Sequence, residues 1–300
     1  MATVDIAALL ALASALCVAI GDVLQQRATH RIADTSIGQL ELFRRLLGNR
    51  RWRWGAVMLV VSIVLQAAAL DQGSVLLVQA LLVLSLLFAL PISARLAGRA
   101  VTAREWAWAV VLTAAVIVIV TVGNPRAGHS TASPRTWAVV AAVLAPLLLA
   151  CLLAARVWGG ALAAALLAFV SGSLWAVFAV LAKGVVHRVG DGGWAVVRTP
   201  ELYAWLLVAV AGFAWEQSAF RAGALTASMP TLEVSQPVVA AALGVAVLGE
   251  TLDTGRAGML ALAVAALVMA AATVALARGD ASATQDRVAA RVPDAAAQPA

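Results

Sequence analysis

The sequence predicts an all-α protein that crosses a membrane about nine times. Of its 300 residues, 63% are hydrophobic and 12% are charged, and the mean hydropathy is +0.95. Soluble domains contain roughly 45–50% apolar and about 25% charged residues. A helix needs about 20 apolar residues to cross a bilayer, and runs of about that length follow one another along most of the chain.

Nine such runs are expected to form the membrane helices. Short connections that contain Gly, Pro or Arg separate most of them. The first run has no basic start and no clear cleavage site, so we interpret it as a membrane helix and not as a secretion signal. The predicted helices are 4–27, 54–70, 74–97, 105–122, 136–155, 160–185, 202–220, 225–248 and 256–277.

Two polar stretches lie outside these runs. The connection 30–53 places Leu40, Phe43 and Leu47 on a face opposite its arginines, which predicts a short helix on the inner membrane surface. The tail 279–300 is rich in Ala, Gln, Asp and Pro, and we expect it to be disordered.

The arginines predict the orientation. With the N-terminus outside, the inner connections hold 15 of the 21 basic residues and the outer connections hold 6. Cytoplasmic loops carry the excess of Lys and Arg. We therefore expect a multi-pass plasma-membrane protein with an external N-terminus and a cytoplasmic C-terminus.

The basic composition does not indicate nucleic-acid binding, because the arginines lie between apolar runs and no nucleic-acid motif is present. The zinc helix HExxH, the nucleophile elbow and the P-loop are also absent. Cys17 and Cys151 lie inside apolar runs and are interpreted as packing residues. We therefore expect no enzyme activity, no cofactor and no nucleic-acid partner.

An internal repeat is predicted. The second to fourth runs share a layout with the seventh to ninth, and an offset of 150 residues aligns Gly73 with Gly223. The first and sixth runs each end near a His-Arg pair, which begins at His30 and at His187. The repeat period is five helices, so the second copy should be inverted in the membrane. Inverted repeats with a site near the midplane are typical of secondary transporters.

This layout predicts four regions. They are a first half (1–128), a linker helix (129–158), a second half (159–278) and the tail (279–300).

The stretch 219–252 resembles the drug/metabolite transporter superfamily, in its EamA-like branch. It begins with an Ala-x-x-x-Gly turn, continues as a proline-bearing helix and ends in Gly249-Glu250-Thr251-Leu252. The first half departs from this pattern, since Leu-Ala-Gly-Arg (96–99) replaces the Gly-Glu ending. The plan of four, one and four helices is also similar to that of the NIPA-type magnesium transporters. The resemblance covers about residues 4–278 and implies a transporter fold.

Glu233 is the deepest acidic residue. Pro230 and Pro237 lie on the same helix face, three residues before it and four after it, and Gln236 is on that side too. Each proline frees a carbonyl four residues earlier, so we predict a helix break and a substrate or proton site here. In this interpretation Glu233 is protonated in the empty site and releases its proton as a cationic substrate binds. The alternative is a protonated glutamate hydrogen-bonded inside the bundle.

Other polar residues are weaker candidates for the same site. Asp22 shares a stripe with Gln25 and Gln26 and is alternatively a polar helix end. Glu216 lies near Arg221 and alternatively pairs with the headgroup region at the interface. Lys183, the only lysine, is either a snorkelling anchor or a counter-charge. Gln66 and Gln79 either bind substrate or tie helices together.

Three functions follow from these residues. The first is a secondary transporter of a small solute, with Glu233 as the proton or substrate site. The second is a divalent-cation transporter in which Asp22, Glu216 and Glu233 supply carboxylates, since Mg²⁺ is held by one or two carboxylates and waters. The third is a membrane scaffold or lipid-handling protein without transport. The partners are the bilayer and a small molecule or ion, and the small residues of 256–277 leave a homodimer open.

Overall fold

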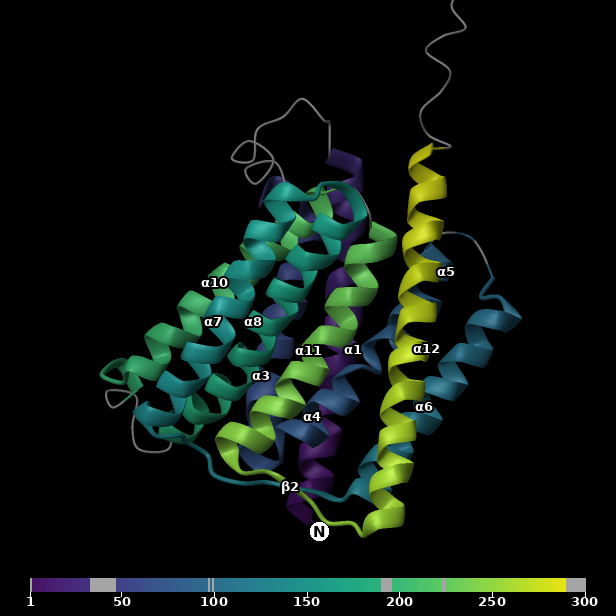
Figure 1. Cartoon of the computed structure of the whole chain (residues 1–300). Helices are drawn as coiled ribbons and strands as arrows, with labels where there is room; N and C mark the ends of the chain where they lie inside the picture. Colours follow the sequence, from purple (N-terminus) through teal and green to yellow (C-terminus); the bar gives the residue numbers. More distant parts are fainter. Residues whose placement is uncertain are drawn as a thin grey trace, which may run out of the picture.

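The computed structural model describes residues 2–32, 47–96, 98, 100–189, 196–222 and 225–289. They form long helices and one pair of short strands (Figure 1). The elements are α1 (Ala2–Ile32), α3 (Arg50–Gln72), α4 (Val75–Leu82), α5 (Ser85–Leu96), α6 (Ala103–Gly123), β1 (Pro125–Arg126), α7 (Pro134–Val157), α8 (Gly160–Val189), α10 (Pro200–Arg221), α11 (Leu225–Leu248), β2 (Thr251–Leu252) and α12 (Arg256–Ala289).

The protein is an all-α polytopic membrane protein. Within the part of the chain that the structure describes, eight helical spans are long and apolar enough to cross a membrane. They are α1, α3, the pair α4–α5, α6, α7, α8, α11 and α12. The helix α10, which carries Glu201, Glu216 and Gln217, is not among them. Nine crossings therefore stay a prediction.

Two predicted boundaries differ from the structure, and a third prediction falls mostly outside the described residues. The third run is not one helix, because a turn at Val83–Leu84 separates α4 from α5. The last helix continues to Ala289, so the first eleven residues of the predicted disordered tail are helical. The surface helix expected within 30–53 falls mostly on 33–46, which lies outside the described residues.

Small residues bring the helices of each half together. Ala7, Ala11, Ala15 and Ala19 form a buried stripe on α1, and α1 packs against α3, α4 and α5. In the second half α8 packs in the same way against α10 and α11. Without a hydrophobic driving force in lipid, helices associate through such close packing.

One hydrogen bond recurs in the two halves. The buried Ser14 hydroxyl of α1 donates to the carbonyl oxygen of Ser62 on α3, at 2.8 Å. The buried Ser171 hydroxyl of α8 donates to the carbonyl oxygen of Gly212 on α10, at 2.9 Å. The donors are 157 residues apart, as are His30 and His187, and the acceptors are 150 residues apart.

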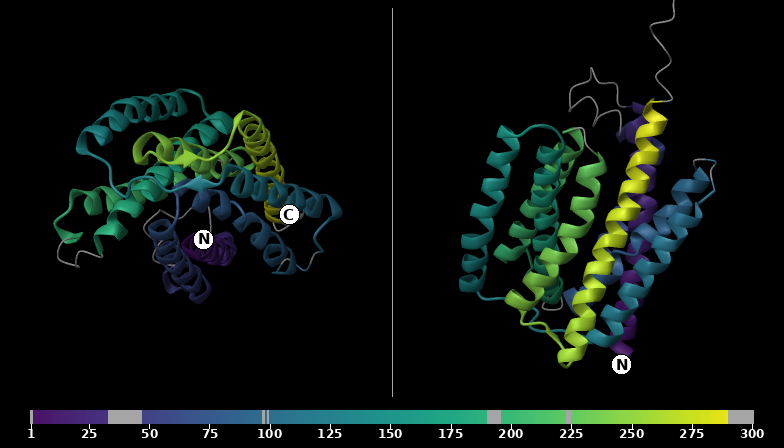
Figure 2. Two further views of the ribbon diagram at one scale, coloured as in Figure 1. Left: turned by 90° about the horizontal axis from the view of Figure 1, so that it is seen from below. Right: turned by 45° about the vertical axis from the view of Figure 1, so that its right-hand side comes forward.

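The remaining helices join the halves or lie beside them. The last helix of each half, α6 and α12, pack against each other. The helix α7 packs mainly on α8 and lies at the edge of the bundle (Figure 2).

Residues after α6 and after α11 meet at the end of the bundle where α1 begins, here called the N-terminal end (Figure 1). The strands β1 and β2 are antiparallel, and Pro125 pairs with Leu252. Asn124 (φ 40°) and Gly249 (φ 63°) end the two helices in left-handed conformations. The chain thereby turns from each of these helices into its strand. The sequence analysis did not predict this strand pair.

The orientation has a direct test. A reporter fused after Gly128 should lie outside the cell, and a reporter fused at Ser282 should lie inside, because the arginine bias places the connection after α6 outside and the C-terminus inside. Alkaline phosphatase and green fluorescent protein fusions report the two sides. Reporters on the same side would contradict the plan of nine crossings.

Candidate functional site

Three acidic side chains from three helices are linked electrostatically through Asp22. Asp22 of α1 lies within electrostatic range of Glu233 on α11 and of Glu216 on α10. We call these three residues the acidic site. The helix α1 belongs to the first half of the chain, whereas α10 and α11 belong to the second. The acidic site therefore draws its members from both halves of the chain.

The acidic site lies away from the N-terminal end. Glu233 is eight residues after the start of α11, which is roughly 12 Å along the helix. Glu216 is five residues before the end of α10. Asp22 is not covered by protein, and the two glutamates are half-buried. Asp22 is therefore the member of the acidic site that protein covers least.

An aromatic row positions Glu216. The indole Nε1 of Trp175 on α8 donates to Oε2 of Glu216 at 2.9 Å. Phe178, one turn further along α8, meets Trp175 edge-on and stacks on Trp205 of α10. The row holds the Trp175 indole in place, so the Glu216 carboxyl group has a fixed hydrogen-bond donor. The sequence interpretation did not include Trp175.

The backbone of α8 approaches α11 next to Glu233. A Cβ atom on Gly172 would overlap the Ser235 hydroxyl and would lie 3.2 Å from the backbone nitrogen of Gln236. Gly172 thus lets α8 contact the turn of α11 that follows Glu233. Gln236 is half-buried there.

The two prolines do not break α11. Pro230 and Pro237 are buried inside one continuous helix, so the predicted helix break is wrong. Neighbouring groups can sustain a membrane helix around a missing N–H. The interruption occurs instead in the first half, at the turn between α4 and α5, which precedes Pro91 by seven residues. There Leu84 and Leu87 donate to carbonyls three residues earlier.

The glutamine candidates lie elsewhere in the bundle. Gln66 on α3 is half-buried. Gln79 on α4 is 2% exposed, and its Nε2 has no hydrogen-bond partner among the described residues. Among the described residues, neither glutamine side chain forms a hydrogen bond with Asp22, Glu216 or Glu233. Gln25 and Gln26 were predicted to share the Asp22 stripe; Gln25 is half-buried, and the side chain of Gln26 lies outside the described part.

The acidic site does not have the geometry of a metal site. Among the described residues, no group of three His, Cys, Asp or Glu side chains is close enough to hold a metal ion. The set Asp22, Glu216 and Glu233 therefore does not form three metal ligands in this conformation.

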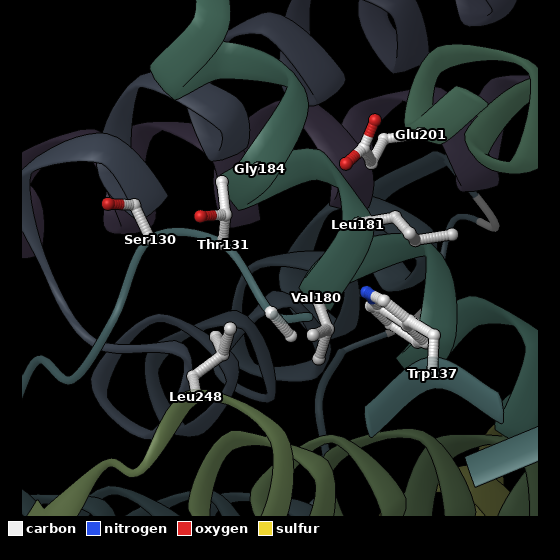
Figure 3. Close-up of a pocket in the computed structure, with 9 residues that line it drawn as sticks. Ser130, Thr131, Trp137, Val180, Leu181, Gly184, Glu201 and Leu248 are labelled. Atoms are coloured by element: carbon white, nitrogen blue, oxygen red, sulfur yellow. The ribbon is translucent and has the colours of Figure 1, made fainter. Parts of the chain in front are cut away.

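Two pockets lie near α8, and neither is lined by the acidic site. One, between α8, α10 and the 130–132 segment, has a volume of about 10 Å³ (Figure 3), about the space of one water molecule. The other, of about 280 Å³, is lined by apolar side chains of α3 and α8 and by Trp205.

A buried ion pair closes the N-terminal end. Nζ of Lys183 on α8 lies 3.1 Å from Oε1 of Glu250, which follows α11. The two side chains are 4% and 0% exposed. Lys183 also donates to the carbonyl oxygen of Gly73 at 2.9 Å. Lys183 is therefore a counter-charge, which was one of its two predicted roles. The other predicted role, an anchor that extends to the membrane surface, does not apply.

Glu250 also caps a helix of the first half. The backbone nitrogen of Val75 donates to its Oε1 at 2.6 Å, and that of Leu76 donates to its Oε2 at 3.0 Å. These are the first two N–H groups of α4, where the helix dipole favours a negative charge. A buried ion pair is tolerated when further hydrogen bonds satisfy its atoms. Glu250 accepts from these two N–H groups, and Lys183 donates to the Gly73 carbonyl oxygen.

The sequence analysis did not identify Glu250 as the partner of Lys183. It appeared only as part of the Gly-Glu ending of 219–252, while Lys183 was a candidate without a named partner. One feature of the sequence could have indicated the pair. Lys183, the only lysine, lies near the end of an apolar run, Glu250 follows another, and both are on the same predicted side of the membrane.

Further contacts hold the same end closed. The backbone nitrogen of His129 donates to the carbonyl oxygen of Leu248 at 2.7 Å. A Cβ atom on Gly128 would overlap that same oxygen. Arg126 and Asp253 form an exposed ion pair beside the strands. We call the contacts of 125–129 with 248–253 the seam.

The fold and these polar groups define a polytopic helical membrane protein with ionisable residues inside the bundle. The chain is 34% identical, over 275 residues, to an uncharacterized protein of Corynebacterium glutamicum; the match covers 91% of this chain and 95% of that protein. The chain belongs to the same family as that protein. No family model matches the chain, and no solved structure matches it.

Proposed function

We propose that the protein is a secondary transporter of the drug/metabolite transporter type, which moves a small cationic solute in exchange for protons. The acidic site is where solute and protons compete. Glu233 is the coupling residue, Glu216 is its positioned neighbour and Asp22 is the entry residue.

The observation that carries this proposal is the acidic site itself. Three carboxyl groups near one another in a low-dielectric region repel if all are ionised. A proton or a cation is therefore needed to neutralise them, and either one displaces the other. Intramembrane ionisable residues mark substrate, ion and proton paths.

The architecture supports alternating access. The order of packing in α1, α3 and α4–α5 matches that in α8, α10 and α11. The Ser14 and Ser171 hydrogen bonds and the starts of α4 and α11 follow the offsets of the proposed repeat. In inverted-repeat transporters the site lies at the interface of the repeats, and the acidic site draws its members from both halves.

The closed N-terminal end supports the same proposal. The ion pair and the seam join the halves at that end, whereas Asp22 is uncovered nearer the other end. With the predicted orientation, this conformation is closed to the outside. The divalent-cation alternative has less support in its three-carboxylate form, because no group of three possible ligands comes together among the described residues.

The test is Glu233→Gln in proteoliposomes, after a screen of small cations identifies a transported solute. The variant keeps the shape of the side chain but cannot ionise. It should insert and fold normally, yet lose solute movement driven by a pH gradient. The measurement is solute flux with and without that gradient.

Glu105→Gln is the matched control. Glu105 closes a capping box with Thr102 at the start of α6, and glutamine preserves that box. Its flux should equal that of the unaltered protein. Unchanged, pH-dependent flux in Glu233→Gln would show that Glu233 is only a buried structural acid.

A further inference from the structure

Donors from both halves converge on the Glu250 carboxylate. Val75 and Leu76 contribute the first two N–H groups of α4, and Lys183 contributes its ammonium group from α8. The carboxylate is fully enclosed, since Glu250 is 1% exposed. Charge-assisted hydrogen bonds of this kind are stronger than neutral ones.

These donors are held by contacts that do not involve Glu250. The buried Ser74 caps α4, and its hydroxyl accepts from the backbone nitrogen of Leu77 at 3.0 Å. Lys183 is fixed by the carbonyl oxygen of Gly73. Gly244 leaves room for the carboxylate, because a Cβ atom there would lie 2.8 Å from its Oε2. The site is therefore built independently of the side chain that fills it.

The occupant is attached at a place where the chain turns. Gly249 has φ of 63°, a conformation that favours glycine. This turn directs Glu250 back toward the bundle, and the Glu250 nitrogen donates to the Gly244 carbonyl at 3.0 Å. Glu250 belongs to the second half, whereas the α4 N–H groups belong to the first.

We infer that Lys183 and the first turn of α4 form a carboxylate-binding site, and that Glu250 is its removable occupant and acts as the latch of the N-terminal end. The inference rests on the proposed function, in which this end opens during transport. Withdrawal of Glu250 separates the end of α11 from the α3–α4 turn. It leaves three donors that bind a small free carboxylate.

By sequence, the latch has no charged counterpart in the first half. The offsets of the proposed repeat place Gln26 opposite Lys183 and Ala100 opposite Glu250. Neither residue is charged, so these two positions cannot form an ion pair. The asymmetry favours a conformation closed at the N-terminal end, as described here.

The experiment uses protein in lipid nanodiscs, so that it does not depend on orientation or on transport. Cys17 and Cys151 are replaced by alanine, and Val78→Cys reports opening. Val78 is fully buried on α4, one turn deeper than Val75. A charged thiol reagent should label it slowly. Glu250→Ala should raise the labelling rate by about tenfold or more, because a buried charge pair is broken.

Formate tests the site itself. Added formate should slow the labelling of Glu250→Ala toward the original rate and raise its thermal stability, whereas methylammonium and chloride should do neither. Adding Lys183→Met to Glu250→Ala should abolish the formate response. Gly255→Cys, which is exposed at the same end but lies outside the seam, should be labelled equally in every variant.

This experiment can fail without the proposed function failing, and the reverse is also true. Formate should act equally with Glu233→Gln present, since that residue lies outside the latch. If Glu250→Ala does not fold, the variant Lys183→Met/Glu250→Gln, which removes both charges, should show fast, formate-insensitive labelling. Labelling that stays slow without the pair, or a Glu250→Ala protein that ignores formate, overturns the inference.

Discussion

Lys183→Met should destabilise the protein by about 3–5 kcal/mol, the usual cost of removing one partner from a buried ion pair. The Glu250 carboxylate would keep its two N–H donors from α4 but would lose its only positive neighbour among the described residues. Equilibrium unfolding in mixed micelles measures the effect. Glu250→Gln should cost a similar amount, because it leaves the Lys183 ammonium buried beside one carbonyl.

The double variant Lys183→Met/Glu250→Gln is the decisive comparison. It removes both charges, so no uncompensated charge remains, and it should be more stable than either single variant. Arg126→Ala is the control at the same end. Its ion pair with Asp253 is more than half exposed, so the loss should be about 0–1 kcal/mol. Additive single-variant losses would show that Lys183 and Glu250 do not act as a pair.

Gly128→Ala should weaken the seam by about 1–3 kcal/mol, the usual cost of overpacking. The new methyl group would overlap the Leu248 carbonyl oxygen and would lie 2.7 Å from the Gly249 carbonyl carbon and 2.9 Å from the Glu250 nitrogen. All three are backbone atoms, so no side-chain rotation relieves the overlap. The 128–129 segment must move, which lengthens the hydrogen bond from His129 to Leu248.

Gly255→Ala is the matched control for that change. A Cβ atom on Gly255 has no neighbour within 4 Å, and its φ is not in the left-handed region. Thermal unfolding of the two purified variants compares them directly. Equal melting temperatures for both would mean that the seam contributes no stability.

The membrane helices could be predicted because their signal is local. Each crossing needs its own run of apolar residues, and that requirement can be read without knowing any neighbour. The predicted run 225–248 and the helix α11 have the same ends. The break at Val83–Leu84 could not be read in this way, because no proline or glycine marks it.

The acidic residues could also be found from the sequence, since a carboxyl group within an apolar run is costly and therefore conspicuous. Asp22, Glu216 and Glu233 were each identified in this way. Their mutual proximity was not, because it depends on how α1, α10 and α11 pack. Trp175 gave no signal, as a tryptophan in a membrane run has many ordinary uses.

The class of protein, the position of nearly every helix and the three acidic candidates could be read from the sequence. Hydropathy and isolated charges are properties of single segments, so they need no tertiary information. Which charges meet depends on how the helices pack. Lys183 and Glu250 are 67 residues apart, and Glu250 and the Val75 nitrogen are 175 apart. Their contact exists because α8, α11 and the α3–α4 turn pack together, and no local pattern encodes that packing.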